Sequence, residues 1–114
     1  TPAISAPDNF VFDKLGNVWI ATDGNPSINR LGKNDGVYTL NVYTKELKMF
    51  LSGVPGCEIC GPEFSEDYKT FFCTIQHPGE DGANTGWPYL NDGVVVPRPA
   101  VIQVQRNDGR EVYL

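Results

Sequence analysis

Two acidic residues precede strand-like segments at related positions in the chain. Asp8 lies in Ala-Pro-Asp-Asn, and Glu58 lies in Gly-Cys-Glu-Ile-Cys-Gly-Pro. Asp8 precedes Phe12 by four residues and Glu58 precedes Phe64 by six, and this even difference predicts that both carboxylates lie on the same face of their strands. They could then share one metal ion. The alternative is a turn capped by Asp8 and Asn9, with Glu58 solvated at a sheet edge.

A second group of coordinating side chains follows the next strand-like segments. His77 opens a His-Pro-Gly-Glu run that ends at Glu80, so an imidazole and a carboxylate lie three residues apart. Asp23 has the equivalent place after the earlier segment, and Arg98, between two prolines, faces either a phosphate or solvent. A hydrogen-bonded structural histidine and an ordinary Asp-Gly turn are the alternatives. The candidates for lining a site are therefore Asn9, Asp23, His77, Glu80 and Arg98.

The three cysteines give no comparable signal. Cys57, Cys60 and Cys73 cannot all pair within one chain, so their number does not announce a disulfide framework. Cys57 and Cys60 have CxxC spacing, but no second CxxC or histidine pair accompanies them, and positions i and i+3 of a strand point to opposite faces. We expect neither zinc binding nor thiol-redox chemistry, and the redox state of the three thiols stays open.

Composition narrows the classes of partner. The 114 residues carry a formal charge of −5 without a basic cluster that could displace counterions from a phosphate backbone, so nucleic acid is not an expected partner. No segment reaches the roughly 18 consecutive apolar residues of a membrane span. The excess carboxylates fit either a solvated acidic surface or oxygen ligands for hard cations such as calcium.

The candidate residues lie in a sequence that nearly repeats itself. The segment 9–23 returns at 62–76, with Phe12 matching Phe64. Twelve glycines and nine prolines separate runs of β-branched and aromatic residues, which favours strands joined by tight turns. A repeat of about 40 to 50 residues built from four short strands is typical of a β-propeller, which has about 4 to 8 blades. We therefore expect an all-β fold of two antiparallel four-stranded blades from a larger propeller.

The expected blades are 1–53 and 54–114, the second with an inserted loop at about 77–99. A loop of that length is more often functional or mobile than idle. The predicted strands are 8–13, 18–23, 37–43 and 47–51 in the first blade, and 59–65, 70–76, 100–106 and 111–114 in the second. The aromatic residues expected to fill the space between neighbouring blades are Phe10, Phe12, Trp19, Phe64 and either Phe71 or Phe72.

Seven segments, taken in order, form one pattern over nearly the whole chain. They are 6–9, 16–24, 34–36, 50–53, 57–62, 75–80 and 97–100, and the Ile-Gln-His-Pro-Gly-Glu run at 75–80 is the most specific of them. This pattern resembles the C-terminal part of the PhoX family of bacterial alkaline phosphatases. The resemblance implies a six-bladed propeller, hydrolysis of phosphate monoesters by a longer parent protein, and a periplasmic or secreted location.

The resemblance also implies cofactors and ligands. Calcium and iron are the family's cofactors, and Glu58, followed by Asp8, matches positions suited to binding them. Cys57 and Cys60 do not inherit the family's iron-binding cysteine, which belongs to an earlier part of the domain. Glu63 lies where the family tolerates other residues, so it is not an expected ligand. The catalytic residues, the substrate preference and the number of metal ions stay open.

Two other hypotheses compete with the phosphatase. One is a non-catalytic or lactonase-like calcium-binding propeller, in which the same carboxylates hold a structural ion, and the other is an interaction module of this length. Repeat spacing reports the fold and not the chemistry, so only the family motifs favour the phosphatase. On either propeller hypothesis the isolated chain leaves blade faces uncovered, and we expect it to self-associate and to be inactive alone.

Overall fold

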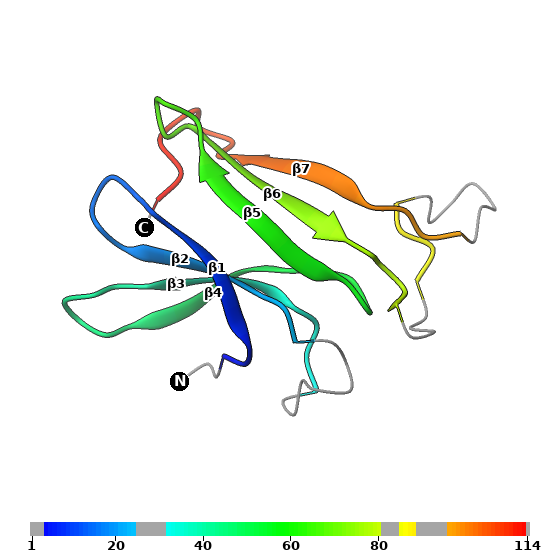
Figure 1. The fold of residues 1–114 in the computed structure, drawn as a ribbon. Coiled ribbons are helices and arrows are strands. Elements are labelled where there is room, and N and C mark those ends of the chain that lie inside the picture. The colour runs from blue at the N-terminus through cyan, green and yellow to red at the C-terminus, as the bar shows by residue number, and fades with distance from the viewer. Residues whose placement is uncertain (1–3, 25–31, 81–84, 89–95, 114) are drawn as a thin grey trace.

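The computed structural model describes residues 4–24, 32–80, 85–88 and 96–113, and within these ranges every assigned element is a β-strand. The first sheet contains β1 (Pro7–Phe12), β2 (Val18–Thr22), β3 (Gly36–Leu40) and β4 (Leu47–Ser52) in that order. The second sheet contains β5 (Glu58–Phe64), β6 (Thr70–Gln76) and β7 (Ala100–Gln105) (Figure 1). All neighbours are antiparallel, which confirms the prediction of an all-β fold of meanders. No helix in the described ranges is long and apolar enough to cross a membrane.

The third strand is shorter than predicted because Asn41, the residue that follows it, forms a turn. The sequence predicted a strand to residue 43, but β3 ends at Leu40. Asn41 Oδ1 accepts hydrogen bonds from the N–H groups of Tyr43 and Thr44 at 2.9 and 3.0 Å, which turns the chain towards β4. The strand therefore ends where an asparagine interrupts the alternation of apolar and polar residues.

The predicted strand at 111–114 is not formed by the described residues 111–113. The N–H of Val112 donates to the carbonyl of Tyr68 in the β5–β6 turn at 2.6 Å, and the Val112 side chain is buried. This contact carries the chain towards that turn instead of along β7. Within the described residues the second sheet thus has three strands, and the division of the chain into blades at 53/54 stays a prediction.

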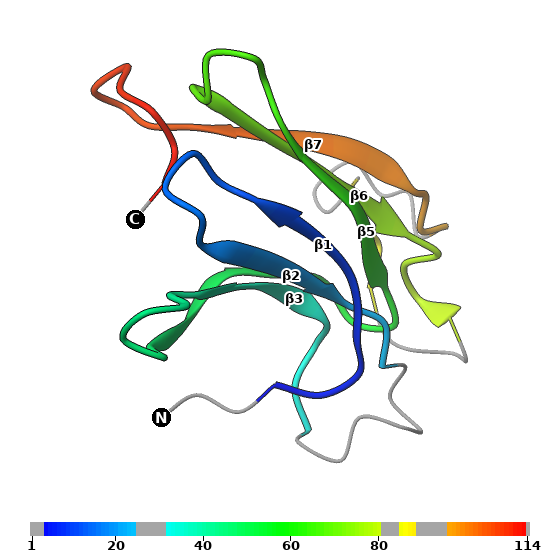
Figure 2. The ribbon, with the colours of Figure 1, turned by 60° about the vertical axis from the view of Figure 1, so that its left-hand side comes forward.

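The two sheets stack face to face (Figure 2). A cluster of aromatic side chains fills the space between them. Trp19 of β2 is fully buried, and its ring centroid lies 4.6 Å from that of Phe50, 5.0 Å from Phe64 and 5.1 Å from Phe71. β5 packs against β1 and β2. The prediction that Trp19 and Phe64 fill the space between the sheets is confirmed, and of the two adjacent phenylalanines it is Phe71 that does so.

The other face of the first sheet is apolar, and no described residue covers it. Phe10 and Phe12 are 63% and 55% exposed, so they do not fill the space between these two sheets as expected. In the ladder Phe12 pairs with Val18, just as Phe64 pairs with Phe71 in the second sheet. The first sheet covers the Phe64–Phe71 face, whereas the equivalent Phe12–Val18 face has no cover among the described residues. The repeats are therefore stacked in the same sense, one behind the other.

A buried carboxylate holds the turn between β1 and β2. Asp13 is 5% exposed, and its Oδ1 accepts hydrogen bonds from the N–H groups of Leu15 and Asn17 at 2.8 and 3.0 Å. Its Oδ2 accepts from Asn17 Nδ2 and from Trp19 Nε1, each at 3.0 Å. The turn and the central tryptophan of the core are thus tied to one side chain.

Candidate metal centre

Four strand ends meet at one end of the stacked sheets. Asp8 lies near the start of β1, and Asp23 directly follows β2, the partner of β1. Glu58 is the first residue of β5 and pairs with Gln76, the last residue of β6, after which His77 follows. Antiparallel pairing puts the start of one strand beside the end of the next, so these side chains gather there.

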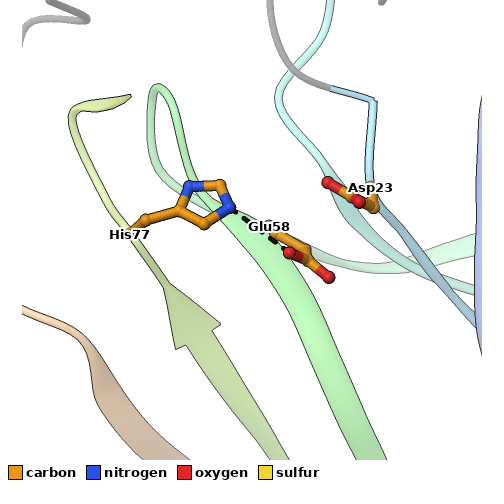
Figure 3. A group of neighbouring side chains, drawn as sticks. All are labelled: Asp23, Glu58 and His77. Atoms are coloured by element: carbon orange, nitrogen blue, oxygen red, sulfur yellow. Dashed lines mark hydrogen bonds and ion pairs between the residues drawn. The ribbon is translucent and has the colours of Figure 1, made fainter. Parts of the chain in front are cut away.

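Asp23, Glu58 and His77 form a compact cluster of coordinating atoms. Each offers one potential ligand atom, and all of these atoms lie within 4.8 Å of one another. Figure 3 shows Glu58 between the other two side chains. Two oxygens on opposite sides of a calcium ion, at bond lengths of about 2.4 Å, are about 4.8 Å apart. The spread of the three atoms therefore fits a single cation.

The orientation of the His77 ring favours a cation at its second nitrogen. His77 Nδ1 lies 3.0 Å from the Gly56 carbonyl oxygen and 3.1 Å from Glu80 Oε2, and because both atoms accept, Nδ1 carries the proton. His77 Nε2 lies 3.3 Å from Glu58 Oε1, so in the neutral ring a lone pair faces a carboxylate (Figure 3). Either a second proton or a metal ion relieves that repulsion.

The backbone supports this arrangement around His77. Its φ of +36° lies in the left-handed region, which non-glycine residues rarely adopt. Residues in this conformation are found more often at functional sites. The residue leaves β6 in this conformation and turns the ring back over Gly56 towards Glu58.

A buried aspartate fixes the backbone on both sides of Asp23. Asp35 is 3% exposed and accepts a hydrogen bond from Thr22 Oγ1 at 2.6 Å and from the Gly24 N–H at 2.9 Å. Thr22 Oγ1 in turn accepts from the Gly36 N–H at 3.0 Å. The segment that carries Asp23 is thereby tied to β3, and the side chain is presented at the strand end.

The electrostatics of the cluster also favour a cation. Burial and then the neighbouring charges of Asp8 and Asp35 raise the pKa of Asp23. Burial and the charge of Asp23 raise the pKa of Glu58, against the opposing effect of His77. Burial lowers the pKa of His77, but its hydrogen bond to the Gly56 carbonyl and the charge of Glu80 outweigh that effect and raise it. A bound cation would stabilise the charged forms of both carboxylates.

The other predicted site residues surround this cluster at different distances. Asp8 is exposed and accepts a hydrogen bond from Asn9 Nδ2 at 2.8 Å, and its charge reaches Asp23 and Glu58, although it is not one of the three clustered ligands. The even residue count does not establish that Asp8 and Glu58 lie on the same face of their strands. Both strands have a register irregularity, at Pro7/Asn9 in β1 and at Cys60/Glu63 in β5. Metal binding by Asp8 stays a prediction.

Glu80 and Arg98 have different surroundings. Glu80 forms an ion pair with His77, whereas Arg98 is exposed and makes no ion pair with the cluster among the described residues. The Arg98 N–H donates to the Trp87 carbonyl at 2.9 Å. Parts of the inserted loop, 81–84 and 89–95, lie outside the described residues.

Sequence reasoning missed two residues that support the cluster. Asp35 appears in the sequence pattern only within the segment 34–36, and Gln76 only at the end of the strand predicted at 70–76 and within the segment 75–80. The antiparallel pairing of the two predicted strands puts Gln76 directly opposite Glu58, so the contact between them could be predicted from the sequence. The hydrogen bonds of Asp35 had no such signal.

Comparisons with known proteins give one family. A family model described as alkaline phosphatase PhoX matches residues 1–79. Among solved structures, Pseudomonas fluorescens PhoX in complex with vanadate, a transition state analogue, matches with a TM-score of 0.82 and 38% sequence identity. The match covers 93% of this chain and 18% of that chain, so the present chain spans less than a fifth of the length of that protein. No curated protein sequence matches.

Proposed function

Because the chain belongs to the PhoX family of alkaline phosphatases, we propose that it is part of a longer, metal-dependent phosphomonoesterase. The observation that carries the proposal is the cluster of Asp23, Glu58 and His77 at the strand ends, with its ligand atoms within 4.8 Å of one another. The remainder of the parent protein would supply further ligands and the groups that bind phosphate.

The donor set fits the metals that the resemblance implies. Carboxylate oxygens suit calcium and iron alike, whereas an imidazole nitrogen suits iron better than calcium. Asp23, Glu58 and His77 would hold one ion, and Asp8, whose charge acts on both Asp23 and Glu58, would contribute to a neighbouring ion. When bound, such ions offset the negative charge of a transferring phosphoryl group.

The protein's own residues would orient that site. His77 donates from Nδ1 to Gly56 and Glu80, which keeps Nε2 free of a proton when a cation is present. Asp35 holds the segment of Asp23, and Glu58 is 13% exposed, so its carboxylate is largely shielded from competing water. The substrate would be a phosphate monoester, and the location of the parent periplasmic or secreted, as in the family.

Two glutamates on one strand allow a matched test in the full-length protein. Glu58→Gln removes a charged ligand while keeping its shape, so we expect metal content to fall and kcat/KM for p-nitrophenyl phosphate to drop about 100-fold. Glu63→Gln should change either quantity by less than about twofold. Glu63 is exposed, and its Oε1 accepts a hydrogen bond from the N–H of Phe64 at 3.0 Å instead of facing the cluster.

Two outcomes would contradict the proposal. Pure full-length protein that hydrolyses no phosphate monoester while it binds calcium would favour the non-catalytic or lactonase-like propeller, and assay with lactones would then separate those two. Equal loss of metal and activity in Glu58→Gln and Glu63→Gln would show that Glu58 is not a specific ligand.

A further inference from the structure

Resting on the proposed function, we propose that Gln76 is a positioning residue, held in turn by Cys60, that fixes the Glu58 carboxylate for metal binding. Gln76 Nε2 donates a hydrogen bond to Glu58 Oε1 at 3.0 Å, and the Cys60 thiol donates to Gln76 Oε1 at 3.0 Å. The three side chains form a relay that leads from the exposed face of the second sheet to the clustered ligands.

The ladder between β5 and β6 creates this relay. Glu58 pairs with Gln76, and Cys60 pairs with Thr74. Side chains two residues apart on a strand share a face, so Glu58 and Cys60 both lie beside the side chain of Gln76. The contact depends on the pairing register and not on a flexible loop.

The chemistry of the partners sets the orientation of the Gln76 amide. An ionised carboxylate only accepts hydrogen bonds, so the amide must present its nitrogen to Glu58. The amide oxygen then faces away, where it meets the thiol hydrogen of Cys60. A donor at position 60 therefore favours the orientation in which Gln76 supports Glu58.

The support matters because the last torsion of a glutamate side chain is broad and nearly free. Both Gln76 Nε2 and His77 Nε2 contact Oε1 of Glu58, at 3.0 and 3.3 Å. Engaging one oxygen from the Gln76 side restricts the rotation of the carboxylate, and this is how outer hydrogen bonds commonly orient metal ligands. The printed hydrogen bonds of the Gln76 side chain join it to Glu58 and Cys60, so its amide reaches the cluster through Glu58.

The test uses the full-length protein and four variants. The first readout is the free Ca²⁺ concentration at half-saturation of the protein, with free Ca²⁺ set by a calcium buffer. The others are kcat, KM and the unfolding temperature. Gln76→Leu should raise that Ca²⁺ concentration about 10-fold, the usual cost of losing an outer hydrogen bond to a metal ligand. Its unfolding temperature should stay the same, because Gln76 is exposed.

Two further comparisons separate orientation from a structural effect. Cys60→Ala should weaken Ca²⁺ binding by about threefold, whereas Cys60→Ser, which keeps a donor, should restore it to within about twofold of the wild type. Gln103→Leu is the matched control, because Gln103 is exposed on β7, the far strand of the same sheet. It should leave Ca²⁺ binding unchanged.

The results distinguish this inference from the proposed function. Wild-type protein that binds Ca²⁺ and hydrolyses p-nitrophenyl phosphate, together with unchanged Ca²⁺ binding in Gln76→Leu, would overturn the positioning role alone. An equal loss in Gln103→Leu, or equal behaviour of Cys60→Ser and Cys60→Ala, would overturn it as well. A wild-type protein without metal binding or hydrolysis would overturn the proposed function itself.

Discussion

Replacing Asp13 with alanine should loosen the first sheet far more than the same change in the equivalent turn of the second. Asp13→Ala removes the acceptor of Trp19 Nε1 where the tryptophan is fully buried, and an unsatisfied buried donor costs about 1–3 kcal/mol. The two lost hydrogen bonds from Asn17, itself 6% exposed, add about 1–2 kcal/mol. The Leu15 N–H lies beside an exposed turn and can bind water instead.

The expected loss of about 3 kcal/mol in the free energy of local opening corresponds to about 150-fold faster hydrogen exchange, since about 1.4 kcal/mol is tenfold. Deuterium uptake by peptides covering β1 and β2 in the full-length protein measures it directly. Asp67→Ala is the matched control: Asp67 is exposed and accepts hydrogen bonds from Ser65 Oγ at 2.7 Å and the Lys69 N–H at 3.0 Å. Its loss should have the small effect of an ordinary surface substitution. Similar acceleration in the two variants would refute the role given to burial.

Four further predictions concern the isolated chain and its thiols. The chain alone should not hydrolyse p-nitrophenyl phosphate, because it spans only 18% of a PhoX protein, and turnover by pure material that is lost on chelation would contradict this. It should self-associate through the exposed face of Phe10 and Phe12, so a strictly monomeric species in sedimentation at micromolar concentration would show that the face needs no cover. Burial raises the pKa of Cys57 to about 11 and of Cys73 to about 12, from 9.0, so stability should fall as pH rises from 9 through these values. At about pH 8 iodoacetamide should label Cys60 alone, and mass spectrometry that finds either buried thiol modified in folded protein would be evidence against it.

Most strands could be predicted because their residues follow simple rules. Runs of β-branched and aromatic residues between turn formers placed β6 at 70–76 and β2 from residue 18. The end of β3 was missed because the side chain of Asn41 competes for backbone hydrogen bonds within an otherwise apolar alternation. The strand predicted at 111–114 does not form over the described residues 111–113, because the Val112 side chain is buried in the core and its N–H donates to the Tyr68 carbonyl instead of pairing with β7.

The candidate site was predictable in outline and not in detail. Strand ends could be located, so the gathering of Glu58, Asp23 and His77 at one end of the sheets follows from antiparallel order. Whether Asp8 and Glu58 face the same point depends on register irregularities in β1 and β5, which the residue count does not show. The supporting hydrogen bonds of Asp35 and Gln76 arise from side-chain positions that only the folded chain defines.

The stacking of two equivalent sheets in the same sense makes their contact heterologous: the Trp19 side of one sheet receives the Phe64–Phe71 side of the next. An assembly built through such an interface always has two different unpaired faces at its ends, because each added sheet covers one face and exposes another. Both end faces become covered only when the rotation between successive sheets brings the two ends together in a ring. The Phe10–Phe12 face, which no described residue covers, corresponds to the Phe64–Phe71 face of the second sheet. We therefore expect copies of this chain alone to associate head to tail, as rings where the rotation between copies closes and as open chains where it does not, and not as two-fold symmetric pairs.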